Sequence, residues 1–247
     1  METWTKNGKE LKLHGVNQHD SWPDTGATVS IEQHRQDLLL MKEHHINAVR
    51  TSHYPKVPEF YQLCDEIGFY VLSDADVEIH GVVTLYGVGG DDNYNMIANA
   101  PCYEHVIVER VKSSILPFRN VTSIFMWSMS NEAGFGCNFE RALEVAYELD
   151  PVHFRHYEGY FQAYKDYDNE DKYLGVYSRM YPTLEESERD YLLHPKKPYI
   201  LCEYSHAMEN GPGDLAAYNK LMEKYPAFIG GFIWKLCDHA EILGYDQ

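Results

Sequence analysis

Two glutamates each follow an apolar, β-rich run of the chain. Glu132 comes after "SIFMWSMSN" and Glu203 comes after "YILC". Two carboxyl groups that face each other can cleave a glycosidic bond, because one donates a proton to the leaving oxygen while the other attacks or assists attack at the anomeric carbon. A separation of about 5 Å would give retention of configuration. The alternative is that each glutamate only caps its strand or pairs with a basic neighbour.

Further polar or aromatic side chains follow other β-rich runs. They are His14, Asn17, His19, Ser52, His53, Tyr54, Asp76, Glu78, His80, Asn131, Glu158, Tyr181, His206, Trp234 and Asp238. In a closed barrel of parallel strands the carboxyl ends of the strands converge on one face. We therefore expect these side chains to surround one site together with the two glutamates.

Glu78 and His80, in "VEIHG", are separated by one residue. In an extended segment both side chains point the same way, so they could share a hydrogen bond without any ion or could both bind a metal. Carboxylate oxygens suit magnesium, whereas imidazole is a less usual ligand for it. The spacing leaves both interpretations open.

Short apolar runs rich in β-branched and aromatic residues alternate with longer stretches of helical period. We expect strands at residues 11–16, 47–51, 69–74, 123–128, 154–158, 174–178, 199–203 and 228–234. We expect helices at residues 30–45, 57–68, 103–118, 138–150 and 215–225. Ser30 can cap the first of these helices.

This alternation predicts an α/β protein with a (β/α)8, or TIM, barrel, in a single catalytic domain over residues 1–247. A doubly wound open sheet is the second choice, and the lack of a GxGxxG or phosphate-loop motif after the first strand disfavours it. Residues 81–102, rich in Gly and Asn, are expected to form an active-site loop. Only 13 residues follow Trp234, so the prediction includes a barrel that is incomplete after its eighth strand.

The composition limits the function classes. With 21 Lys and Arg against 38 Asp and Glu, the formal charge of −17 disfavours binding to nucleic acid or to an anionic membrane. The five cysteines form no CxxC pair, which fits reduced thiols. No secretory h-region and no run of 18 apolar residues occurs, so we expect a cytoplasmic protein.

Several longer phrases resemble the catalytic barrel of beta-galactosidases of glycoside hydrolase family 2. They are "LHGVNQHDSWPDTG", "INAVRTSHYP", "LCDEIGFYVLSDADVEIHG", "WSMSNEAGFG", "YSRMYP", "ILCEYSHAMENGPGDL" and "GGFIWKLCDHA". They come in the family's order, from about residue 8 to residue 240. "SHYP" and the "NE" pair are also shared with beta-glucuronidases, whereas "EIHG" and "ILCEYSHAM" look specific to the beta-galactosidase branch.

The resemblance implies a retaining hydrolase of beta-D-galactosides that works through a glycosyl-enzyme. It implies that Glu132 is the general acid/base, that Glu203 is the nucleophile and that Asn131 binds the sugar 2-hydroxyl. Crowding and partial burial would raise the pKa of the acid. Donors such as Tyr181 and Arg50 would favour an ionised nucleophile.

The resemblance also assigns a cofactor and substrate contacts. It implies Mg²⁺ held by Glu78, His80 and Glu132. The implied substrate contacts are His19, His53, His206, Tyr181 beside the nucleophile, and Trp234 as an aromatic floor for galactose. Without the resemblance, Trp234 would be interpreted as a core residue.

The sequence departs from the family pattern at Gln18, Ser73, Asp74, Ser130, Glu209, Lys235 and Leu236. Lys235 stands beside Trp234 where the family has an acidic residue. We expect it to pair with Glu209 or to perturb a catalytic carboxylate.

Family members surround this barrel with β-sandwich domains, one of which supplies sugar contacts and a ligand for a monovalent cation. No such sequence is present here, so a monovalent-cation site would lack that ligand, and we expect self-association through surface that those domains cover. Besides a small-molecule beta-galactoside hydrolase, two alternatives stay open. One is an excised or redesigned barrel that only binds carbohydrate or acts as a scaffold. The other, a beta-glucuronidase, is disfavoured because no basic cluster occurs in the terminal loops.

Overall fold

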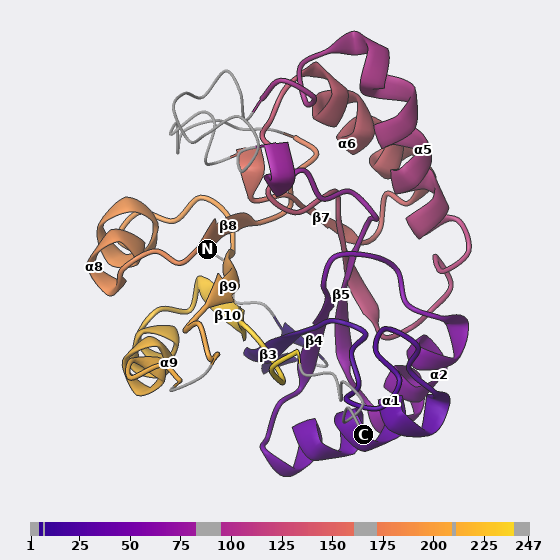
Figure 1. The fold of residues 1–247 in the computed structure, drawn as a ribbon. Coiled ribbons are helices and arrows are strands. Elements are labelled where there is room, and N and C mark those ends of the chain that lie inside the picture. The colour runs from indigo at the N-terminus through magenta and orange to yellow at the C-terminus, as the bar shows by residue number, and fades with distance from the viewer. Residues whose placement is uncertain (1–4, 7, 83–94, 161–171, 209–210, 240–247) are drawn as a thin grey trace.

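Eight parallel strands form the main sheet of the protein. The computed structural model describes residues 5–6, 8–82, 95–160, 172–208 and 211–239. The strands are β3 (Leu13–Gln18), β4 (Ala48–Thr51), β5 (Tyr70–Asp74), β6 (Ile124–Ser128), β7 (Phe154–His156), β8 (Tyr177–Met180), β9 (Tyr199–Tyr204) and β10 (Phe228–Ile233). Their order is β7-β6-β5-β4-β3-β10-β9-β8, and every neighbouring pair is parallel. Figure 1 shows the strands around a centre with the helices outside them.

The helices cover the outside of this sheet. They are α1 (Ile31–Glu43), α2 (Pro58–Ile67), α5 (Glu104–Ile115) after the 3-10 turn η1 (Pro101–Tyr103), α6 (Cys137–Leu149), α8 (Leu184–Ser187) with the π-helical turn η2 (Glu188–Leu192), and α9 (Leu215–Lys224). Ser30 and Gln33 form a capping box at the start of α1. Gly68 ends α2 in the left-handed conformation, which glycine adopts without steric cost. A small hairpin, β1 (Thr5–Lys6) with β2 (Lys9–Glu10), precedes the barrel.

The barrel is nearly closed between β7 and β8. Gly175 N donates to Arg155 O at 3.1 Å, just before β8 begins. A Cβ on Gly175 would lie 2.3 Å from the Phe154 ring, so this glycine packs directly against the start of β7. The strand β8 starts at Tyr177, three residues later than the predicted 174. The barrel and the other predicted strands and helices are confirmed within a few residues, whereas the β1–β2 hairpin and the α8–η2 segment were not predicted.

Two hydrophobic clusters hold the fold together. The larger one lies between the sheet and the helices. The smaller one fills the barrel and consists of Leu13, Ala48, Leu72, Met126, Val176, Ile200, Ile229 and Phe232. Fully burying such a side chain stabilises the fold by about 1.5–3 kcal/mol.

The next layer toward the carboxyl ends of the strands is polar. Inward-facing positions of a strand recur every second residue. Two residues after Ala48, Leu72 and Met126 come Arg50, Asp74 and Ser128, all of them buried. The polar layer therefore lies directly above the apolar one.

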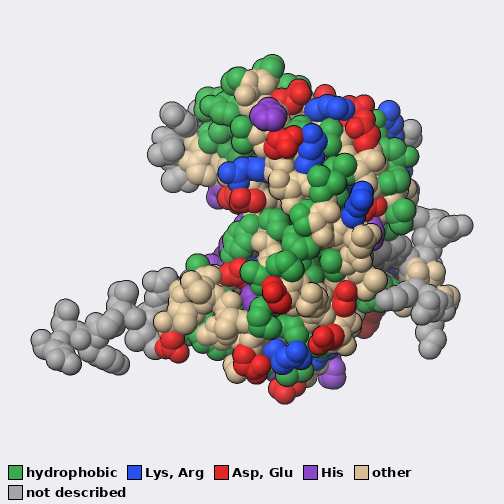
Figure 2. All heavy atoms as spheres, turned by 90° about the vertical axis from the view of Figure 1, so that its right-hand side faces the viewer, with side chains coloured by type: hydrophobic (Ala, Val, Ile, Leu, Met, Phe, Trp, Pro, Cys, Tyr) green, Lys and Arg blue, Asp and Glu red, His purple; other side chains and the backbone are tan. Residues whose placement is uncertain are grey.

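Charged groups on the outer face over α2 and α5 are mixed in sign. Figure 2 shows this face, with acidic and basic side chains interspersed among hydrophobic ones. None of the described helices is both long and apolar enough to span a bilayer.

Candidate active site

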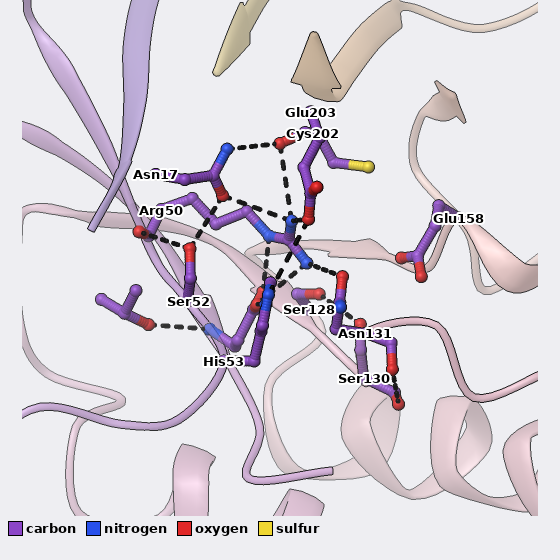
Figure 3. A network of polar contacts seen from close by, with 12 residues as sticks. Asn17, Arg50, Ser52, His53, Ser128, Ser130, Asn131, Glu158, Cys202 and Glu203 are labelled. Atoms are coloured by element: carbon purple, nitrogen blue, oxygen red, sulfur yellow. Dashed lines mark hydrogen bonds and ion pairs between the residues drawn. The ribbon is translucent and has the colours of Figure 1, made fainter. Parts of the chain in front are cut away.

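Arg50 occupies the centre of the polar layer and connects several strand ends (Figure 3). Its guanidinium is fully buried and binds Asp74 through Nε at 3.1 Å and through Nη2 at 2.9 Å. Nη1 donates to Glu203 Oε1 at 2.8 Å, and Nη2 donates to Asn131 Oδ1 at 2.9 Å. Burial disfavours this charge, but Asp74 and Glu203 raise the pKa of Arg50, so the cation persists. The ends of β6 and β9 thus meet at one guanidinium.

Glu203, in β9, is almost completely buried and receives two donors. Besides Arg50, the Tyr181 hydroxyl donates to its Oε2 at 2.9 Å. Burial raises the pKa of Glu203 to about 7, Arg50 and Tyr181 oppose that rise, and Glu132 adds to it. The two donors suggested from the sequence are therefore present, although burial outweighs them.

Glu132 follows Asn131 and faces the same region. Its backbone has φ 41°, in the left-handed region, and its N–H donates to Glu158 Oε1 at 2.8 Å. The carboxylate Oε2 lies 2.9 Å from His80 Nδ1. Burial raises the pKa of Glu132, and the Glu78 charge adds to the rise while His80 opposes it.

A histidine and a tryptophan form a wall beside Glu203. His53 Nδ1 lies 3.0 Å from Asp74 Oδ2, and His53 Nε2 lies 3.8 Å from Glu203 Oε1. The His53 ring stacks on Trp234 at 5.4 Å with an interplanar angle of 6°. His19 meets both rings edge-on, at 5.3 Å and 5.5 Å. The structure therefore brings these three predicted substrate contacts together.

His206 lies beside Tyr181, and the centroids of the two rings are 6.0 Å apart. Both residues line a cavity of about 660 Å³, which continues between α8 and the start of α9. This volume is in the range of small-molecule sites. The two catalytic candidates and all of the predicted substrate contacts are thus at the carboxyl end of the barrel.

Glu78, His80 and Glu132 form a cluster that could hold a metal ion. One ligand atom from each lies within 4.8 Å of the others. Glu78 Oε2 accepts from Asn131 Nδ2 at 2.6 Å, and its Oε1 accepts from the His80 N–H at 2.7 Å, so the carboxylate is held in place. All three side chains reach solvent, which lets water complete the coordination of Mg²⁺. Two carboxylates with a water-accessible opening fit magnesium, and the imidazole is the less usual member.

Some of the predicted site residues lie away from the two catalytic candidates or have other contacts. Asp76 pairs with Arg110 on the surface, and His14 lines a separate hollow near the end of α1. The Tyr54 hydroxyl accepts from the Asp20 N–H at 2.8 Å. Asp238 is exposed beyond β10.

Two expectations fall outside the described residues in whole or in part. Glu209 and most of the predicted active-site loop at residues 81–102 lie outside the residues that the structure describes. Lys235 is described: it is 5% exposed, its Nζ lies 5.9 Å from the Trp234 ring centroid, and burial lowers its pKa. Among the described residues it forms no ion pair with either catalytic candidate.

Sequence reasoning missed how much of the site depends on buried partners. Asp74 appeared only as a departure from the family pattern, yet it binds both Arg50 and His53. Asn17 Oδ1 accepts from Arg50 and from the Ser52 hydroxyl. One signal was available, because an arginine inside the apolar run "NAVRT" must be buried with partners.

Comparison with known proteins identifies the family. The model of "Glycosyl hydrolases family 2, TIM barrel domain" matches residues 2–246. The chain belongs to glycoside hydrolase family 2. It is 48% identical over 236 residues to a beta-galactosidase of Staphylococcus xylosus, and 41% identical over 237 residues to one of Priestia megaterium. These matches cover 95% and 96% of the chain but only 24% and 22% of the two relatives.

Solved structures support the fold of this family 2 barrel. A beta-glucuronidase of Bifidobacterium dentium, complexed with coumarin-3-O-glucuronide, aligns with a TM-score of 0.72 over 97% of this chain and 42% of that chain. The sequence identity is 21%, so this likeness concerns the fold alone.

Proposed function

We propose that this family 2 barrel carries the catalytic site of a retaining beta-D-galactoside hydrolase. The observation that carries the proposal is the single guanidinium of Arg50 that binds both Asn131 and Glu203. It joins Asn131, the residue before Glu132 beyond β6, to the carboxylate of Glu203 in β9, which supports a site where the two glutamates act on one glycosidic bond. The identity with beta-galactosidases, up to 48% among the relatives compared, supports the galactoside as the substrate class.

In the first half of the reaction, the Glu203 carboxylate attacks the anomeric carbon of the sugar. The bond from that carbon to the leaving oxygen breaks, and Glu132 gives its proton to this oxygen. Burial raises the pKa of Glu132, which favours the protonated form that a general acid needs. Arg50 and Tyr181 favour the ionised form of Glu203 against the effect of burial.

In the second half, a water molecule replaces the leaving group. Glu132, now ionised, takes a proton from the water, and the oxygen attacks the anomeric carbon while the bond to Glu203 breaks. The configuration at the carbon is inverted twice and is therefore retained. Asn131, fixed by Arg50 and Glu78, would bind the 2-hydroxyl, where hydrogen bonds strengthen in the transition state.

Glu78, His80 and Glu132 would hold Mg²⁺. A bound divalent cation supplies positive charge that lowers the pKa of a neighbouring carboxyl. Without it, the contact with His80 is the main attraction on the Glu132 carboxylate.

The test is turnover of a chromogenic aryl beta-galactoside, with an aryl beta-glucuronide in parallel, each with and without magnesium. Glu203→Gln should abolish galactoside turnover, and a 2-deoxy-2-fluoro-galactoside should label Glu203, as read by peptide mass spectrometry. Glu109→Gln, which breaks a surface ion pair with Lys112 on α5, serves as the control and should keep wild-type turnover.

Three results would contradict the proposal. They are turnover that persists in Glu203→Gln, a label on another residue, and hydrolysis of the glucuronide in preference to the galactoside. A first product of inverted anomeric configuration, read by NMR, would refute the double displacement alone.

A further inference from the structure

The end of β7 contacts the loop that follows β6 at several points. We call Tyr157, Glu158 and Gly159 the β7 clasp. The Tyr157 hydroxyl donates to Gly134 O, and a Cβ on Gly159 would lie 2.7 Å from that same oxygen. Just before the clasp, His156 O accepts from Met129 N at 3.0 Å. The loop that carries Glu132 is therefore packed against this strand end.

Glu158 of the clasp contacts Glu132 itself. Its side chain is fully buried, and Oε1 accepts from the Glu132 N–H at 2.8 Å. The left-handed backbone of Glu132 (φ 41°) is unfavourable for a non-glycine residue and persists only where neighbouring groups impose it. The Glu132 N–H is partly buried, so losing this acceptor would cost free energy, and the carboxyl favours this conformation over others.

Asn131, just before Glu132, and Gly134, two residues after it, are held by other groups. Asn131 N donates to Val77 O at 2.9 Å, and the Asn131 side chain is bound by Arg50 and Glu78. Gly134 is held by Tyr157. Loss of the Glu158 carboxyl would therefore release Glu132 while leaving its neighbours in place.

We propose that Glu158 is a positioning residue that sets the direction of the Glu132 carboxyl through the Glu132 backbone. The inference rests on the proposed function, in which Glu132 is the general acid/base. The Glu158 side chain is fully buried, so its proposed action on the reaction is through Glu132. Its loss should weaken proton transfer to the leaving group more than any other step.

The dependence of kcat on the leaving group distinguishes this positioning role from a merely structural one. A dinitrophenolate departs without protonation, whereas the methoxide of a methyl galactoside requires the acid. Glu158→Met removes the strong oxygen acceptor at similar length. It should lower kcat about tenfold or more for the methyl galactoside relative to the dinitrophenyl galactoside. Azide should accelerate the variant on the dinitrophenyl substrate, because an anion can replace the missing base in the second half-reaction.

Two further variants serve as controls. Glu158→Gln keeps a carbonyl oxygen at the same distance along the side chain, so it can still accept from the Glu132 N–H, and it should restore most of the methyl galactoside turnover. Asp150→Asn perturbs another buried carboxylate ahead of β7, which binds Trp127 Nε1 and does not contact Glu132. It should affect both substrates equally.

Equal losses on both substrates in Glu158→Met, or a Gln variant as poor as the Met variant, would overturn the inference. A crystal structure of Glu158→Met that keeps the Glu132 backbone and carboxyl unmoved would overturn it as well. Should Glu158→Met not fold, Glu158→Asp, which withdraws the acceptor by one methylene, takes its place. A wild-type protein without galactoside turnover would refute the proposed function, and the crystal structure alone would then decide the positioning role.

Discussion

Replacing Arg50 by methionine should destabilise the protein strongly, because two buried carboxylates would lose their cation. The side chains of Asp74 and Glu203 are 0% and 5% exposed, and their ion pairs with Arg50 measure 2.9 Å and 2.8 Å. Removing one partner of a buried ion pair costs about 3–5 kcal/mol. For a domain of this size that corresponds to a fall in Tm of about 6–20 °C.

The loss should depend on pH in a defined direction. Without Arg50, burial would hold the pKa values of Asp74 and Glu203 above their values in the unfolded chain. Such a carboxyl contributes stability that is present below the unfolded pKa and lost as the pH rises through the folded pKa. The deficit of Arg50→Met relative to wild type should therefore be larger at pH 8 than at pH 5.5.

Urea unfolding followed by tryptophan fluorescence at both pH values measures the effect. Arg35→Met is the matched control, because Arg35 and Glu66 form an exposed pair at 3.5 Å, and such pairs contribute about 0–1 kcal/mol. A loss below about 1 kcal/mol in Arg50→Met, or a deficit that grows as the pH falls, would refute the account of Arg50 as the ionic centre of the barrel.

Three further predictions concern activity and packing. Burial raises the pKa of Glu203 to about 7 and attack needs the carboxylate, so kcat/KM should fall as the pH drops below about 7. Tyr181→Phe removes a hydrogen-bond donor to Glu203 and should move this acidic limb of the pH profile to higher pH. An unmoved limb would show that the Tyr181 contact does not lower the pKa of Glu203. Gly230→Ala should cost about 1–3 kcal/mol or more, because φ is 148° and a Cβ would lie 2.2 Å from Leu13 O; an unchanged Tm would count against this packing. Chelation should lower activity reversibly, and Glu78→Gln should raise the magnesium concentration needed for half-maximal activity by about tenfold; activity indifferent to chelator would argue against the metal.

The barrel could be predicted from the sequence because its signals are local. Alternating apolar runs and helical periods fixed nearly every strand and helix to within a few residues. The exceptions are short or irregular. The segment Leu184–Leu192 has a single turn of α-helix before a π-helical turn, too short to display a helical period, and its Thr183 capping box was the one available cue.

The sequence predicted which residues belong to the candidate site, but it did not predict how they contact one another. Polar side chains after apolar strands pointed to the right face of the barrel, and the family resemblance supplied their roles. The partners of those side chains come from distant strands, as when Asp74 of β5 binds Arg50 of β4 and His53 beyond it. No spacing in one stretch of sequence records a contact between strands, so the polar layer became visible only with the fold.

The backbone conformation of the site residues is the feature that the sequence predicts least well. Beyond the ends of β6, β8 and β9, Glu132, Tyr181 and Ser205 have φ values of 41°, 47° and 48°. Glycine is the residue that usually adopts this conformation, and none of the three is glycine. Holding a non-glycine residue in this conformation costs roughly 1–3 kcal/mol. Two of the three place groups of the proposed reaction: the carboxyl of Glu132 and the hydroxyl that donates to Glu203. A side chain is needed at these positions, so glycine cannot relieve the strain, and neighbouring strands must impose it. Tyr181 N donates to the backbone oxygen of Glu203 in β9, and Glu132 N donates to the side chain of Glu158 just beyond β7, so in both cases the acceptor comes from the neighbouring strand or its end.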